Sequence, residues 1–165
     1  MLPQDNLLNL DNFKTEKMNL NNREPDILLE VPAQVYFLPA IGHFAKAIFT
    51  KHPYFEKCSE EVLYSLELII YESAANVIKH AYPEGTIGKL KLKIWMDPQK
   101  VILDVIDNGK GFDPNNLPEP DPASPGEGGM GVFLIKKIAQ RFSYFFSKEE
   151  NGNVLHLEIP LKKKV

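Results

Sequence analysis

Residues 107–112 read DNGKGF, and this stretch separates a hydrophobic run from a segment rich in glycine and proline. A carboxylate that ends a strand and is followed by two glycines is held at a fixed depth, while the backbone beyond it can approach another molecule closely. Asp-Gly turns are common, so the D-x-G-x-G pattern alone is a weak signal. We interpret Asp107 as the floor of a nucleotide pocket whose other walls come from the rest of the chain.

The residues before this stretch have the alternation of β-strands. Residues 89–96 alternate between apolar and mostly basic side chains, which predicts a strand with one buried face and one basic, solvated face. The first set is Leu90, Leu92, Ile94 and Met96, and the second is Lys89, Lys91, Lys93 and Trp95. A turn at residues 97–100 leads to a second strand, in which Asp107 continues the apolar face of residues 101, 103 and 105.

Earlier in the chain, the spacing of apolar residues predicts a strand and two helices. The strand covers residues 27–31, and the first helix runs from residue 33 to 51 with an irregular first turn around Pro39. The second helix extends to about Ala81, with Ser59 as its N-cap. Later in the chain, a short helix is expected after residue 131. A hairpin of residues 142–147 and 154–160 follows, turning at residues 151–152.

The second predicted helix carries Glu72, Asn76 and His80 at spacings of four residues, which places all three near one helix face. An exposed polar face explains this pattern about as well as a binding site does. As a site, Asn76 offers an oxygen ligand suited to Mg²⁺, and Glu72 could orient or deprotonate a nucleophile. His80 taken by itself is more often structural than catalytic.

Residues 109–131 contain six glycines and five prolines. A connection of this length in a compact domain usually has a function. Its last part, GEGGMG at residues 126–131, leads directly into a helix. Glycine-rich backbone at a helix N-terminus favours a phosphate, because free N–H groups and the helix dipole both attract an anion. The stretch lacks the Gly-Lys-Ser/Thr of a Walker loop and follows no strand, so it is not a dinucleotide fingerprint. An uninformative flexible loop is the alternative.

Composition sets the broad class. The chain has 165 residues, a net charge of −3 and a single cysteine, Cys58. We expect a flexible arm at residues 1–26 and one folded domain at residues 27–165. The charge does not indicate nucleic-acid binding. No signal peptide and no run long enough to cross a bilayer is evident, so a cytoplasmic protein that does not bind a membrane is expected.

The order and separation of these patterns resemble the ATP-binding boxes of the GHKL superfamily, which includes gyrase and the histidine kinases. The resemblance is closest to the bacterial anti-sigma factor serine/threonine kinases and covers residues 27–161. Four stretches in sequence order support it: YESAANVIKHAYPEG, DVIDNGKGFDP, GGMGVFLIKKIAQRFSY and NGNVLHLEIP. It implies a Bergerat-type fold, an α/β two-layer sandwich whose mixed, largely antiparallel sheet is covered on one face by helices.

The resemblance also implies residue roles and the cofactors ATP and Mg²⁺. Glu72 would be the general base, Asn76 the Mg²⁺ ligand, and Asp107 the acceptor for the adenine amine. The glycines at 109 and 111 would shape the pocket, and residues 126–131 would form a lid over the phosphates. The implied nucleotide-binding set is Asn76, His80, Asp107, Gly109, Gly111, Gly126, Gly128, Gly129, Met130 and Gly131. Many GHKL members place a threonine near the adenine in the last strands, and His156 stands in the corresponding area of this chain.

The function that the resemblance implies is a protein kinase that binds a sigma factor and phosphorylates a serine or threonine of a STAS-type anti-anti-sigma partner. Such proteins commonly form homodimers. The alternative is a nucleotide-binding regulatory module that sequesters a protein partner without phosphoryl transfer. The ATP domain of a histidine kinase is a third reading. It is disfavoured because the arm before residue 27 has no histidine and is too short for a two-helix hairpin.

Overall fold

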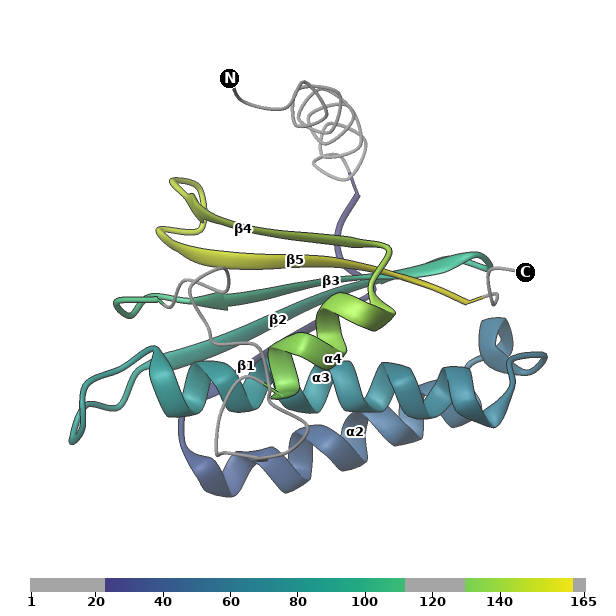
Figure 1. The fold of residues 1–165 in the computed structure, drawn as a ribbon, viewed down its shortest axis with the longest axis horizontal. Coiled ribbons are helices and arrows are strands. Elements are labelled where there is room, and N and C mark those ends of the chain that lie inside the picture. The colour runs from purple at the N-terminus through teal and green to yellow at the C-terminus, as the bar shows by residue number, and fades with distance from the viewer. Residues whose placement is uncertain (1–22, 112–129, 162–165) are drawn as a thin grey trace.

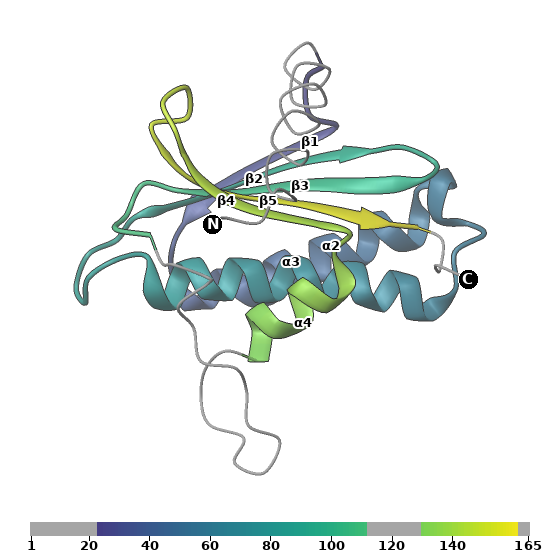
Figure 2. The ribbon, with the colours of Figure 1, turned by 45° about the horizontal axis from the view of Figure 1, so that its top comes forward.

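The computed structural model describes residues 23–111 and 130–161, which form two layers. One layer is a sheet of five strands, and α2, α3 and α4 all lie on the same face of it (Figures 1 and 2). The predicted α/β two-layer sandwich is therefore confirmed. The elements in chain order are β1 (Ile27–Pro32), a 3-10 turn (Val35–Phe37), α2 (Leu38–Lys51), a second 3-10 turn (Pro53–Phe55), α3 (Glu60–His80), β2 (Lys89–Met96), β3 (Lys100–Asp107), α4 (Met130–Ile138), β4 (Arg141–Ser147) and β5 (Gly152–Pro160).

The strands are ordered β1-β2-β3-β5-β4, and every neighbouring pair is antiparallel. Of the mixed and antiparallel arrangements expected from the sequence, the antiparallel one is found. The connection that contains α4 carries the chain from β3 past the position of β5 to the edge strand β4. The hairpin at residues 151–152 then returns β5 to pair with β3, and Asn151 adopts a positive φ of 49° in that turn.

The ends of the helices follow local sequence signals. The Oγ atom of Ser59 accepts a hydrogen bond from the backbone N–H of Val62 at 3.3 Å, which confirms the predicted N-cap of α3. The irregular start expected around Pro39 is a 3-10 turn that precedes α2, and Pro39 occupies the first turn of α2. These signals decide where each helix starts on the sheet.

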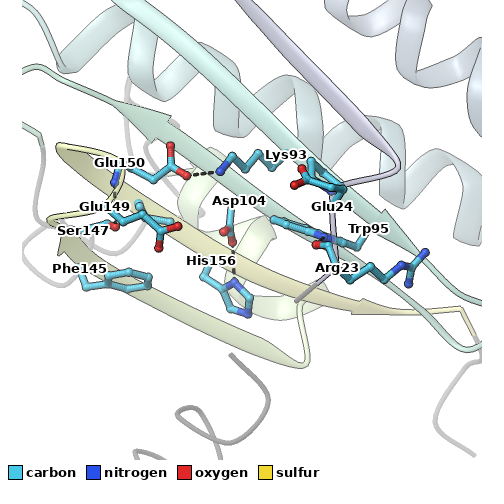
Figure 3. A pocket seen from close by; sticks show the side chains of 12 residues that line it. Arg23, Glu24, Lys93, Trp95, Asp104, Phe145, Ser147, Glu149, Glu150 and His156 are labelled. Atoms are coloured by element: carbon cyan, nitrogen blue, oxygen red, sulfur yellow. Dashed lines mark hydrogen bonds and ion pairs between the residues drawn. The ribbon is translucent and has the colours of Figure 1, made fainter. Parts of the chain in front are cut away.

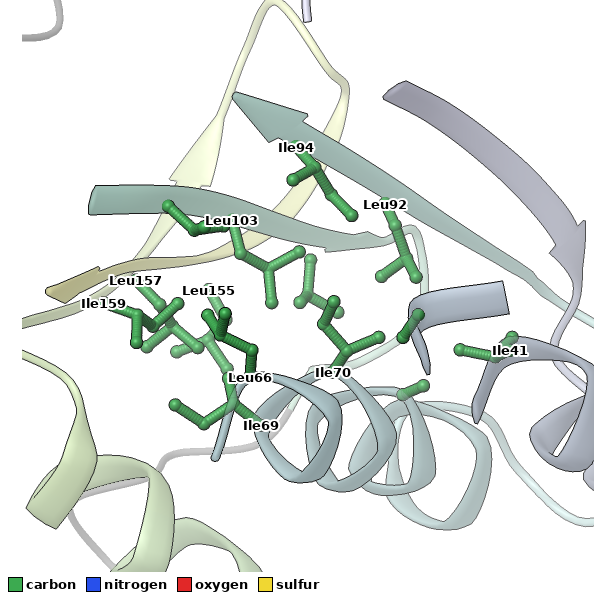
Figure 4. Packing of buried hydrophobic residues seen from close by; sticks show 14 of the residues in the cluster. Ile41, Leu66, Ile69, Ile70, Leu92, Ile94, Leu103, Leu155, Leu157 and Ile159 are labelled. Atoms are coloured by element: carbon green, nitrogen blue, oxygen red, sulfur yellow. The ribbon is translucent and has the colours of Figure 1, made fainter. Parts of the chain in front are cut away.

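The core lies between α3 and the helix-covered face of the sheet (Figure 4). Each strand contributes alternate residues, as the period of two predicts. Leu92 and Leu103 come from the central strands, and Ile69 and Ile70 come from α3; all four are fully buried. Asp107 continues the same face at the end of β3, so its carboxylate lies at the margin of the core.

The opposite face of the sheet was expected to be basic and solvated along β2, and this holds for Lys89 but not for the rest of the strand. Trp95 is only 7% exposed there. Glu150 pairs with both Lys91 and Lys93, so neither lysine simply projects into water. The sequence of β2 alone does not indicate that Lys91 and Lys93 are paired, because their partner Glu150 lies in the hairpin between β4 and β5.

A polar groove of about 160 Å³ runs along this face (Figure 3). Its floor contains a pair between His156 and Asp104, with Nδ1 2.5 Å from Oδ1. Glu158, beyond the groove, pairs with Lys100 at 2.8 Å and with Arg141 at 3.1 Å. Cross-strand ion pairs therefore satisfy the charges of this face.

The residues just before β1 are attached to β2. The backbone N–H of Met96 donates to Asp26, and the indole N–H of Trp95 donates to the carbonyl of Arg23. The predicted division of the chain into an arm and a domain at residue 26 stays a prediction. Within the described residues, no helix has the length and apolar character needed to cross a membrane.

His156, in the floor of this groove, has a raised pKa. Burial of the imidazole opposes its protonation, but hydrogen bonds with Asp104 and Glu158 outweigh burial and raise the pKa of His156. The hydrogen bond with His156, together with Lys100 and Arg141, lowers the pKa of Glu158 to about 2. Protonated His156 therefore stabilises the fold below its unfolded pKa of about 6.5, and the gain is lost as pH rises through the folded value.

We predict that the free energy of unfolding contributed by this cluster is larger at pH 6 than at pH 8. His156→Gln should remove most of the difference between the two pH values, as measured by urea denaturation. His43→Gln is the matched control, because His43 is exposed on α2 and its loss should leave the pH dependence unchanged. Equal pH dependence in wild type and His156→Gln would contradict the assignment.

Candidate functional site

Asp107 is the centre of the candidate site and is only 3% exposed. Its Oδ1 atom accepts two hydrogen bonds, from the backbone N–H of Gly109 at 2.9 Å and from the side-chain amide of Asn153 at 3.0 Å. Asn153 lies opposite Asp107 in the β3–β5 register. Within residues 23–111 and 130–161, both hydrogen bonds to this carboxylate end on Oδ1, which holds the group in one orientation and leaves Oδ2 for another donor.

The turn after Asp107 is tied to the end of α3. The hydroxyl oxygen of Tyr82 accepts from the backbone N–H groups of Asn108 at 3.1 Å and Lys89 at 3.0 Å. It also donates to the side chain of Asn108 at 2.8 Å. The N–H of Lys110 donates to the carbonyl of Ala81 at 2.9 Å. One phenol and one backbone bond therefore hold the Asp107 turn against the helix that carries Glu72 and Asn76.

Both glycines of this turn are required by space. A Cβ atom on Gly109 would lie 2.1 Å from the carbonyl oxygen of Ala81. Gly111 has a φ of +71°, and its Cβ would lie 2.2 Å from the hydroxyl of Tyr144. No side chain fits at either position, so the backbone itself forms the wall next to Asp107.

The three polar residues of α3 lie at different depths. Glu72 and Asn76 are half-buried, and His80 is exposed at the last turn of the helix. The Nδ2 atom of Asn76 and the Oγ atom of Ser73 are buried and have no hydrogen-bond partner among the described residues. Buried polar atoms without a partner are costly in a folded protein.

The glycine-rich segment reaches Glu72 at its C-terminal end. Gly131, in the first turn of α4, lies against Glu72, and a Cβ there would be 2.4 Å from Oε2. Met130 is 42% exposed at the start of the same helix. The predicted lid residues Gly126, Gly128 and Gly129 lie outside the described residues. The end of the predicted lid therefore meets the predicted base.

The prediction that His156 stands where the adenine-contact threonine is usually found is corrected by the register of β5. His156 pairs with Asp104 on the opposite face of the sheet, whereas Asn153 lies beside Asp107. The sequence does contain a signal for this. Asn153 is the one polar residue in the alternate series that continues with Leu155, Leu157 and Ile159. Tyr82 has no local sequence signal for its role, because Asn108, which it binds, lies 26 positions further along the chain.

The residues present fit Mg²⁺ better than a metal that needs a full set of protein ligands. Among residues 23–111 and 130–161, no group of three or more His, Cys, Asp or Glu side chains could hold a metal ion. Mg²⁺ takes few protein ligands and keeps water and phosphate oxygens. The side-chain oxygen of Asn76, one helical turn from Glu72 on α3, is a ligand of the kind that Mg²⁺ accepts.

Comparisons with known proteins agree with this geometry. The histidine kinase-like ATPase domain family matches residues 31–159. The serine-protein kinase RsbW of Halalkalibacterium halodurans is 28% identical over 137 residues, which cover 78% of this chain and 79% of that protein. RsbW of Bacillus subtilis is 22% identical over 127 residues, covering 72% and 77%.

The chain is also similar to domains of solved structures. The histidine kinase domain of a blue-light activated histidine kinase, Erythrobacter litoralis EL346, has a TM-score of 0.47 and 18% sequence identity. The match covers 79% of this chain and 62% of that one.

Tyr82→Phe should destabilise the protein by about 2 kcal/mol, because the N–H groups of Asn108 and Lys89 lose their acceptor. Urea denaturation measures the change. Tyr64→Phe is the matched control, since Tyr64 is 64% exposed on α3 and its hydroxyl should contribute almost nothing. A cost below a few tenths of a kcal/mol at Tyr82 would show that the phenol does not hold the turn.

Proposed function

We propose that this chain, which belongs to the histidine kinase-like ATPase domain family, is an ATP- and Mg²⁺-dependent protein kinase for serine or threonine. The names of its relatives support the choice of hydroxyl acceptor, because they are serine-protein kinases. The observation on which the proposal depends is the buried carboxylate of Asp107, oriented by two donors and attached to the helix that presents Glu72 and Asn76.

Asp107 selects the base of the nucleotide. A carboxylate accepts hydrogen bonds only, and an exocyclic amine such as that of adenine is a donor. Asn153 and Gly109 both bind Oδ1, so Oδ2 is the atom that accepts from the amine. The backbone around Gly109 and Gly111 allows a flat ring to approach closely. His80 lies at the exposed end of α3, one helical turn beyond Asn76.

Glu72 takes the proton from the acceptor hydroxyl as that oxygen attacks the γ-phosphorus of ATP and ADP leaves. Asn76 would hold Mg²⁺, which would neutralise charge on the phosphates. Residues 126–131 are the proposed lid, whose backbone N–H groups would donate to the phosphates. Most of the rate enhancement in such a site comes from positioning and charge stabilisation.

The protein substrate is a serine or threonine of a STAS-type anti-anti-sigma factor, and the second partner is a sigma factor. The resemblance of the chain to anti-sigma factor kinases supports this choice, together with the relatives named above. The working form is a homodimer in the cytoplasm. Thermal unfolding with ATP or ADP and Mg²⁺ gives a direct test, because a ligand that binds only the folded state raises stability.

Glu72→Gln should lower phosphoryl transfer to a STAS-type protein by about 100- to 10,000-fold, because the proton acceptor is removed. Affinity for ATP should stay close to that of wild type. Transfer is measured with radiolabelled ATP, and affinity by calorimetry. Glu67→Gln, also on α3, is the matched control and should transfer normally. Full activity in Glu72→Gln would exclude Glu72 as the base.

Asp107→Asn should weaken ATP binding by about 10- to 100-fold, because a charged acceptor is replaced by an amide that also carries a donor. Calorimetry with ATP and with GTP measures the change and its base selectivity. Asp104→Asn, on the same strand but the opposite face, should bind ATP as wild type does. Normal ATP affinity combined with lost transfer in Asp107→Asn would reverse the roles of Asp107 and Glu72.

The same experiments distinguish the proposed kinase from a regulatory module that sequesters a protein partner without phosphoryl transfer. A protein that only sequesters its partner would bind ATP and a sigma factor and transfer no phosphate to any STAS-type protein. A pull-down from native extract, with and without ATP and Mg²⁺, followed by mass spectrometry for phosphoserine, separates the two functions.

A further inference from the structure

Gly131 has no conformational reason to be glycine. It is the second residue of α4, and among the described glycines only Gly85 and Gly111 have a positive φ. Any residue can adopt the helical backbone at this position. Within a helix, glycine is less favourable than every residue except proline. A glycine here is therefore explained by its surroundings rather than by its own backbone.

The surroundings do exclude a side chain. A Cβ on Gly131 would lie 2.4 Å from Oε2 of Glu72 and 3.3 Å from Cδ. The other helical glycine, Gly42 in α2, has room, because its Cβ would lie 3.6 Å from Tyr71, an ordinary contact. The two positions thus differ in one respect: only Gly131 is in contact with a carboxylate.

The helix cannot easily move away to make room. Val132 and Ile135 of α4 are buried, and Ile135 belongs to the hydrophobic core. Moving α4 outward would expose both residues. The carboxylate of Glu72 is the far end of a flexible side chain and moves more readily. An added methyl group at residue 131 would therefore displace the carboxylate and leave the two helices in place.

The end of α4 nearest Glu72 also suits a carboxylate. The first N–H groups of a helix have no partner within it, and the helix dipole places partial positive charge at that end. The carboxylate of Glu72 lies beside the first turn of α4, at Gly131. Contact with α4 therefore limits the space open to the carboxylate, and the helix end favours its charge.

We propose that Gly131 is a positioning residue for phosphoryl transfer: its missing side chain lets α4 contact Glu72 and sets the carboxylate where it receives the proton. This inference rests on the proposed kinase function. It assigns to Gly131 a role distinct from binding phosphate. The end of the lid and the base form one unit, so a change in the position of α4 changes the position of the base.

The first test is Gly131→Ala. The turnover number kcat for transfer to a STAS-type protein should fall by roughly 10- to 100-fold, because displacement of a catalytic group by about 1 Å has effects of this size. The KM for ATP should change less than about threefold. The midpoint of thermal unfolding should be unchanged or raised, since alanine favours the helix. Gly42→Ala is the matched control and should change stability in the same direction without lowering kcat.

The second test removes the collision instead of the glycine. Glu72→Asp shortens the side chain by one methylene and leaves room for the methyl group. Glu72→Asp alone should lower kcat, but adding Gly131→Ala to it should cost less than about twofold further. An equal loss of kcat from Gly131→Ala in both backgrounds would overturn the proposal. So would a raised KM for ATP with unchanged kcat, which would indicate a phosphate-binding role.

A third measurement does not depend on activity. The carboxyl carbon of Glu72, observed by ¹³C nuclear magnetic resonance, should shift in Gly131→Ala and stay unchanged in Gly42→Ala. An unchanged signal in Gly131→Ala would overturn the contact itself. If wild type transfers no phosphate, the proposed function fails, and the resonance experiment still decides whether Gly131 positions Glu72.

Discussion

The attachment of the Asp107 turn to the end of α3 is the constraint on which the candidate site depends. The phenol of Tyr82 and the carbonyl of Ala81 accept from the backbone N–H groups of Asn108 and Lys110 in that turn. Gly109 makes the close approach of the two segments sterically feasible. Without this attachment, Asp107 would be a carboxylate at the end of a strand, and the polar residues of α3 would have no fixed relation to it. The site is thus built by a junction between two layers.

The two faces of the sheet carry different kinds of residue, because successive side chains of a strand point to opposite faces. The helix-covered face holds the core and, at its margin, Asp107 and Asn153. The opposite face holds buried charges, and these are matched by cross-strand partners such as His156 with Asp104. A shift of β5 by one residue would exchange the two sets and destroy both. The register of β5 therefore determines which residues line the candidate site as well as which residues form the core.

A second contact between remote segments joins α4 to Glu72 on α3. α4 packs on α3 through buried apolar residues, and its first turn meets Glu72 at Gly131. Under the proposed kinase function, the place of the proton acceptor is therefore set by the packing of α4 on α3.

Local patterns in the sequence determined the elements of this protein. Alternation at residues 89–96, the cap at Ser59 and the turn at residues 151–152 each depend on neighbours within a few residues, so they could be read directly and were confirmed. The tertiary structure alone decided which remote residues meet. Asp107 meets Asn153, Tyr82 meets Asn108 and Glu72 meets Gly131, and the members of these pairs lie 26 to 59 positions apart along the chain. Strand register and helix packing set those contacts, and neither is encoded in any single stretch.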